Sequence, residues 1–234
     1  MKSARNLTLA AALAAAAVAP AWAQSTTFQN GSFSSGATGW TLYGDAQVRT
    51  TGSRVAVLST ASVDNEDDFP LEAGFNNNSG NPAVDFFEVP DLAGVPVGLL
   101  DVGGFAYEGS AIRQDFTALA GDILDIRFDW AFLSTETTQP DYGFIAINNT
   151  VVSFVDITSQ VLNSRFLGTF GDFNNVEWDW VSTQYSYAAQ SSGAVSLVIG
   201  VIDINDGLNT SELRLDNIAV TAVPEPETIA MLLA

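Results

Sequence analysis

Residues 25–222 contain no apolar stripe of helical period, and this constrains the fold more than any other feature of the chain. Short runs rich in β-branched and aromatic residues alternate instead with clusters of Gly, Asn, Asp and Ser, as in strands joined by turns. In one run Ile126, Phe128 and Trp130 fall on one face of a strand, and charged residues fall on the other. The pattern predicts an all-β fold, a two-sheet antiparallel β-sandwich of the jelly-roll kind. Comparable runs occupy 46–59, 110–117, 142–147, 151–155, 177–188, 194–202 and 212–222.

The charge balance is strongly acidic, with eight basic and 27 acidic residues. Two of the basic residues, Lys2 and Arg5, precede every acidic one, so the chain beyond residue 23 sets six Arg against all 27 carboxylates. Such a surface repels nucleic acid and anionic lipid headgroups. A nucleic-acid partner is therefore excluded.

The sequence has no Cys and no His. Disulfides and catalytic machines built on a histidine base are excluded, as are zinc and haem sites of the usual kinds. No nucleotide cofactor is expected either. A metal here would have to be a hard cation bound by oxygen atoms, and Ca²⁺ is the natural candidate.

The first 23 residues have the pattern of a signal peptide, which would form a helix ahead of the sandwich. Lys2 and Arg5 supply its positive end, and an Ala-rich apolar stretch follows that is too short to span a bilayer comfortably. Ala21 and Ala23 form an A-x-A cleavage site for signal peptidase. The chain is therefore expected to be secreted from a bacterial cell.

Pro224, Glu225 and Pro226, followed by an apolar stretch at 229–234, resemble the PEP-CTERM sorting signal. The stretch is shorter than the roughly 20 residues that cross a bilayer, and no Arg cluster follows it, so the resemblance is to a truncated form. It implies that an exosortase-type protease cuts the tail and that the protein lies at the outer cell surface. The chain then divides into a signal peptide (1–23), one β-sandwich domain (24–222) and a sorting tail (223–234).

A second resemblance joins the two ends of the domain. The segments Asn30–Phe33, Gly39–Trp40 and Leu215–Ile218 are similar to the first and last strands of galactose-binding-like jelly rolls, the fold of many carbohydrate-binding modules. The resemblance implies that these ends pair, and that Asp216 ligates a structural Ca²⁺. Ser34 stands where an acidic ligand is common, which departs from the family pattern.

Three predicted loops carry acidic clusters, at 64–68, 136–141 and 203–206, and four acidic residues of the last two form a candidate calcium site. Glu136 and Asp141 follow one strand, and Asp203 and Asp206 follow another. If both strands end at the same edge of the sandwich, these carboxylates meet and can supply oxygen ligands. The alternative is that they are solvated loop carboxylates, as is usual in so acidic a chain.

Trp178 and Trp180 are two residues apart on a predicted strand and so share one face. Exposed indole rings stack on the apolar faces of sugars, so the pair predicts a polysaccharide-binding platform. The alternative is that both rings fill the core, where Trp40 and Trp130 are expected.

Together these features favour a non-catalytic protein that binds polysaccharide in an exopolysaccharide matrix or at the cell surface. Two alternatives remain from the sequence. One is a structural matrix or surface-coat protein without a specific ligand. The other is a glycoside hydrolase, for which paired carboxylates suffice, although no motif singles out a pair.

Overall fold

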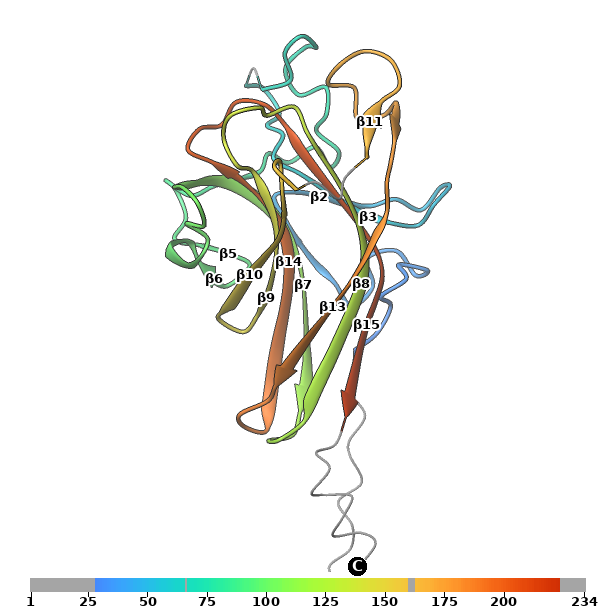
Figure 1. The fold of residues 1–234 in the computed structure, drawn as a ribbon, viewed down its shortest axis with the longest axis vertical. Coiled ribbons are helices and arrows are strands. Elements are labelled where there is room, and N and C mark those ends of the chain that lie inside the picture. Colours follow the sequence, from blue (N-terminus) through green and yellow to red (C-terminus); the bar gives the residue numbers. More distant parts are fainter. Residues whose placement is uncertain (1–27, 66, 160–162, 224–234) are drawn as a thin grey trace, which may run out of the picture.

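The computed structural model describes residues 28–65, 67–159 and 163–223. The predicted signal peptide, with Ala21 and Ala23, and the predicted sorting tail, with Pro224, Glu225 and Pro226, lie outside these ranges. The described part consists of antiparallel strands and one short 3₁₀ helix (Figure 1). None of its helices is long and apolar enough to cross a membrane.

Two antiparallel sheets face each other, which confirms the predicted β-sandwich (Figure 1). Successive strands repeatedly cross from one sheet to the other, as in a jelly roll. In order, the first sheet contains β1 (Thr41–Tyr43), β7 (Ala106–Ala118), β14 (Gly193–Ile204), β9 (Tyr142–Ile147) and β10 (Thr150–Asp156), with β4 (Val84–Asp85) paired to β7. The second sheet contains β13 (Val181–Ala188), β8 (Ile123–Ser134), β15 (Ser211–Val223), β3 (Ala56–Ser59) and β2 (Asp45–Val48).

Two small hairpins and the 3₁₀ helix complete the described elements. The pair β5 (Asp91–Leu92) and β6 (Val95–Pro96) precedes the helix η1 (Val97–Leu99). The pair β11 (Arg165–Phe166) and β12 (Val176–Glu177) precedes β13. The sequence predicted a single strand over 177–188, but residues 178–180 have no strand pairing, so this stretch is divided between β12 and β13.

The main core lies between the two sheets. It is built from the apolar alternate residues of the long strands, such as Leu197 and Ile199 of β14 and Leu213 and Leu215 of β15. Trp40 and Trp130 are both buried here, as predicted. The period-two alternation of these strands is what turns one face of each sheet inward.

The chain ends of the described domain meet as the family resemblance implies, although residues 28–40 form turns rather than a strand. The backbone N–H of Ile218 donates a hydrogen bond of 3.0 Å to the carbonyl of Gly31. A Cβ atom at Gly31 would lie 1.7 Å from the Ile218 carbonyl oxygen, so only glycine fits this crossing.

The outer face of the first sheet carries a second apolar core. The segment from β4 to the start of β7 lies across this face and buries Phe86, Leu92 and Leu100 against Phe144 and Val198. Both faces of the first sheet are thus covered. The second sheet has no such second apolar core among the described residues, so part of its outer face stays accessible to a ligand.

Candidate functional site

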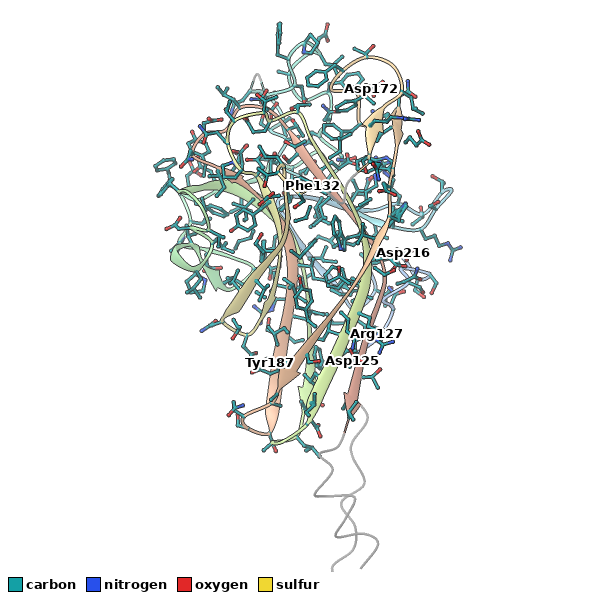
Figure 2. All side chains as sticks on the ribbon, in the orientation of Figure 1. Asp125, Arg127, Phe132, Asp172, Tyr187 and Asp216 are labelled. Carbon is teal, nitrogen blue, oxygen red and sulfur yellow. The ribbon has the colours of Figure 1, made fainter. Side chains whose placement is uncertain are left out.

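The outer face of the second sheet is covered at one end, where Phe173 and Trp178 lie over the Arg214 side chain, and is open and polar along β13 and residues 125–129 of β8. Along β13 the residues alternate between half-buried and exposed, and the exposed set begins with Ser182 and Gln184. Asp125 and Arg127 of β8 and Asp216 of β15 lie on the same side of the molecule (Figure 2). Strands with one apolar and one polar face leave this surface to solvent.

A shallow groove of about 310 Å³ runs across this face. Asp129 is fixed within it, because Asn217 donates a hydrogen bond of 2.8 Å to Oδ2 and the Ser182 hydroxyl donates one to Oδ1. A second groove of about 520 Å³ lies towards the opposite edge of the sheet and is bounded by β2 and by Asn77 and Asn78. Carboxylate, amide and hydroxyl groups held in this way can donate to and accept from sugar hydroxyls.

The two predicted ligand-binding tryptophans lie in the interrupted stretch before β13, and neither belongs to the core. Trp180 is 41% exposed. Trp178 is half-buried, with the Arg214 guanidinium carbon 3.9 Å from the centroid of its ring and the ring of Phe173 stacked at 6.3 Å. The alternative that both rings fill the core is therefore wrong, whereas their binding role stays a prediction.

The predicted calcium ligands are brought together in part. Glu136, Asp141, Asp203 and Asp206 all lie at one end of the sandwich, where the negative charges of the other three each raise the pKa of Asp203. Asp216 does not join them, because it faces outward on the second sheet beside Asp129.

Glu136 is the fully bonded member of this set. Its Oε1 accepts hydrogen bonds from the backbone N–H groups of Thr137, Thr138 and Gln139, and its Oε2 accepts one of 3.0 Å from the Asn209 amide. Although burial disfavours the charged form, these backbone donors lower the pKa of Glu136. The loop therefore holds Glu136 as a carboxylate that caps its own turn.

Asp141 and Asp203 are enclosed in different ways. Each oxygen of Asp141 accepts one hydrogen bond, from the Ile204 N–H (3.0 Å) and from the Ser211 hydroxyl (2.7 Å). Asp203 is 1% exposed, and neither of its carboxylate oxygens has a hydrogen-bond partner. Burial, followed for Asp203 by the charge of Asp141, raises the pKa of both groups.

Two further acidic residues lie near this set: Glu108, which the sequence reasoning missed, and Asp67, which belongs to the acidic cluster at 64–68 but was not among the predicted ligands. Glu108 of β7 is directly opposite Asp203 in the β7–β14 register, and its pKa is raised to about 8 by burial and by the charges of Asp67, Asp85 and Asp141. Burial also raises the pKa of Asp67 to about 6. The available signal was a single carboxylate inside an otherwise uncharged stretch of strand at 106–112.

No family model and no curated protein matches the sequence. Among solved structures, a family 61 carbohydrate-binding module in complex with β-1,4-galactotriose aligns with a TM-score of 0.42 and 8% identity, over 84% of this chain and 97% of that chain. A family 4 carbohydrate-binding module aligns with a TM-score of 0.39 and 9% identity, over 82% and 99%. The CBM22-1 xylan-binding domain from Paenibacillus barcinonensis aligns with a TM-score of 0.35 and 11% identity, over 87% and 97%. At these scores the likeness does not establish a ligand, and the fold rests on the sheets and cores described above.

Proposed function

We propose that this protein is exported to the cell surface or extracellular matrix and binds polysaccharide there without cleaving it. The observation that carries the proposal is the pairing of an open polar sheet face with an exposed indole at its edge. Trp180 lies two residues before Ser182, which lines the groove around Asp129. The binding surface proposed here consists of that groove together with Trp178 and Trp180, and is called the glycan face below.

The chemistry of the glycan face suits a sugar chain. Sugars present hydroxyl groups at their edges and weakly polar C–H faces, so they need fixed polar partners and a flat aromatic ring. Asp129 is already oriented by Ser182 and Asn217, which removes part of the entropy cost of fixing a hydrogen-bonding partner on binding. A shallow groove open along the sheet also leaves room for a polymer to continue past the site.

Export is supported by the two ends of the sequence. The leader ending at Ala23 and the motif at Pro224–Pro226 are the features that signal peptidase and an exosortase-type protease would process. Fractionation of the native host, followed by sequencing of the N-terminus, tests this part. A protein that stays in the cytoplasm and keeps Met1 contradicts it.

Calorimetric titration of the purified protein with the producing strain's own exopolysaccharide tests binding. We expect saturable binding with no change in the length of the polysaccharide. The substitution Trp180→Ala should weaken the affinity at least tenfold, about 1.4 kcal/mol, because an exposed ring that stacks on a sugar contributes through that contact. Phe87→Ala is the matched control, because Phe87 is 67% exposed but lies in the segment that covers the first sheet.

Each other outcome of the titration has a distinct meaning. An equal loss in the two variants would remove the glycan face from the proposal. No heat and no depletion of the polysaccharide would instead favour a structural matrix protein without a specific ligand.

A further inference from the structure

A row of carboxylates crosses the first sheet at one end of the sandwich. In the strand registers Glu108 of β7 is opposite both Asp85 of β4 and Asp203 of β14. Asp141 comes directly before β9 and is bonded to Ile204, the last residue of β14. Directly opposed residues of antiparallel strands have their side chains on the same face, about 5 Å apart at Cβ.

This row faces the inside of the sandwich. Ser110, two residues after Glu108, donates a hydrogen bond of 2.6 Å to the carbonyl of Ser59 on the second sheet. Val201, two residues before Asp203, belongs to the core between the sheets. Side chains two apart on a strand share a face, so Glu108 and Asp203 point into the space between the two sheets.

The described residues offer no positive charge to this row. Their four ion pairs join Arg side chains to carboxylates elsewhere. Both oxygens of Asp203 and one oxygen of Asp67 are enclosed without any hydrogen-bond partner. Buried carboxylates are normally paired or bound to a metal, and like charges directly opposite on a sheet repel each other. Without a cation, only the protons that burial favours on Glu108 and Asp203 can compensate the row.

The row is open to solvent on one side. A cleft of about 640 Å³ is lined by Glu108 and Asp85, and by the uncharged polar residues Asn65 and Asn81. A hydrated cation can therefore reach Glu108 without unfolding of the sandwich. Carboxylate and amide oxygens are the ligands that hard divalent cations prefer.

We propose that Glu108 and Asp203, with the unbonded oxygen of Asp67, bind a divalent cation of the Ca²⁺ type at the inner end of this cleft. Within the described residues no three carboxylates are already arranged around one point, so binding turns these side chains towards the ion. The site keeps Asp203 of the set expected from sequence and assigns no ligand role to Glu136 or Asp216. It is independent of the glycan face.

Calorimetric titration of chelator-stripped protein with CaCl₂ tests the site, together with thermal unfolding in EDTA and in excess Ca²⁺. We expect one saturable binding event and a rise in Tm of roughly 5–10 °C when Ca²⁺ is at 100 times its Kd. Glu108→Gln and Asp203→Asn should each abolish the heat and the Tm rise, while folding is checked by circular dichroism. Two variants are used because Asp203 is enclosed and Glu108 lines the cleft, so one remains informative if the other fails to fold.

Asp216→Asn is the matched control and should bind Ca²⁺ as the unchanged protein does. The proposal is overturned if the unchanged protein gives no heat and no Tm rise with Ca²⁺. It is equally overturned if a folded Asp203→Asn or Glu108→Gln variant binds Ca²⁺ with unchanged affinity. Loss of binding in Asp216→Asn alone would place the ion at the position that the family resemblance implies.

Discussion

Two groups of buried carboxylates lie in this sandwich, and they differ in whether the chain supplies them with hydrogen-bond donors and cations. On the second sheet, Asp45 accepts hydrogen bonds from Ser59 and from the backbone of Asn78 and Ser79, and Glu212 accepts one of 2.7 Å from Arg214. On the first sheet, Asp203 is equally buried and accepts none.

The difference shows that burial alone does not define a structural carboxylate. Asp45 and Glu212 tie the loop at 76–79 to the second sheet, and every charge there has a partner within the chain. On the first sheet, Asp203 has no hydrogen-bond donor and no cation among the described residues, and the pKa values of Asp203 and of Glu108 opposite it are raised, so only bound protons compensate these two carboxyl groups. The first group completes the fold, and the second is built as an incomplete site.

The largest loss of stability is expected when the buried Glu212–Arg214 ion pair of the second sheet is broken. Arg214→Met leaves Glu212, which is 1% exposed, without its cation and removes the guanidinium from the ring of Trp178. We expect a loss of about 3–5 kcal/mol in the free energy of unfolding, measured by urea denaturation. Arg165→Met is the control, because both members of the Arg165–Glu177 pair are exposed and the pair should contribute about 1 kcal/mol or less. Equal losses of unfolding free energy in the two variants would mean that the buried Arg214 pair contributes no more than an exposed pair.

The second prediction concerns how stability depends on pH, measured on protein that a chelator keeps free of metal. It tests the carboxyl groups of the first sheet. The pKa of Glu108 is raised in the folded state to about 8, so the folded protein holds a proton that the unfolded chain releases near its ordinary value. Glu108 should therefore contribute a fall in stability of about 3 kcal/mol between pH 5 and pH 8, and the raised pKa values of Asp67, Asp141 and Asp203 should add to that fall. Chemical denaturation at several pH values measures this, and a rise over that range would contradict it. The charged groups that act on Glu108 are Asp67, Asp85 and Asp141, and those that act on Asp203 are Asp141, Glu108, Asp206 and Glu136.

The smallest changes in stability are expected from replacing one buried Asp of each group by Asn, and the two changes should have opposite signs. Asp45→Asn removes a charge that three donors stabilise, so we expect a loss of about 1–3 kcal/mol. Asp203→Asn replaces a carboxyl group that must take up a proton to be buried at neutral pH, so chelator-treated protein should gain about 1 kcal/mol. Urea denaturation of both variants at pH 7.5 provides the measurement. The same sign in both would mean that the two groups are not different.

The alternation of apolar and polar residues predicted the sandwich and the burial of Trp130, because both depend on local periodicity. The meeting of Asp141 with Asp203 could also be predicted, since Asp141 directly precedes one apolar run and Asp203 closes another. Glu108 was missed, because its position opposite Asp203 depends on the β7–β14 register. The 64–68 cluster was noticed, but that Asp67 comes close to Glu108 depends on the path of a long loop and could not be predicted. The interruption before β13 was missed as well, since periodicity runs through 177–188 without a break in the sequence.

The position of β15 has a mechanical consequence. This strand lies between β8 and β3 inside the second sheet and ends at Val223, the last described residue. The hydrogen bonds of an antiparallel pair are perpendicular to the strands, so a pull along β15 at Val223 stretches the whole β8–β15 ladder at once. A pull across the sheet would open the same ladder one pair at a time. A tether attached beyond Val223 and aligned with the strand would therefore load the domain in shear, the direction in which a sheet resists force most strongly.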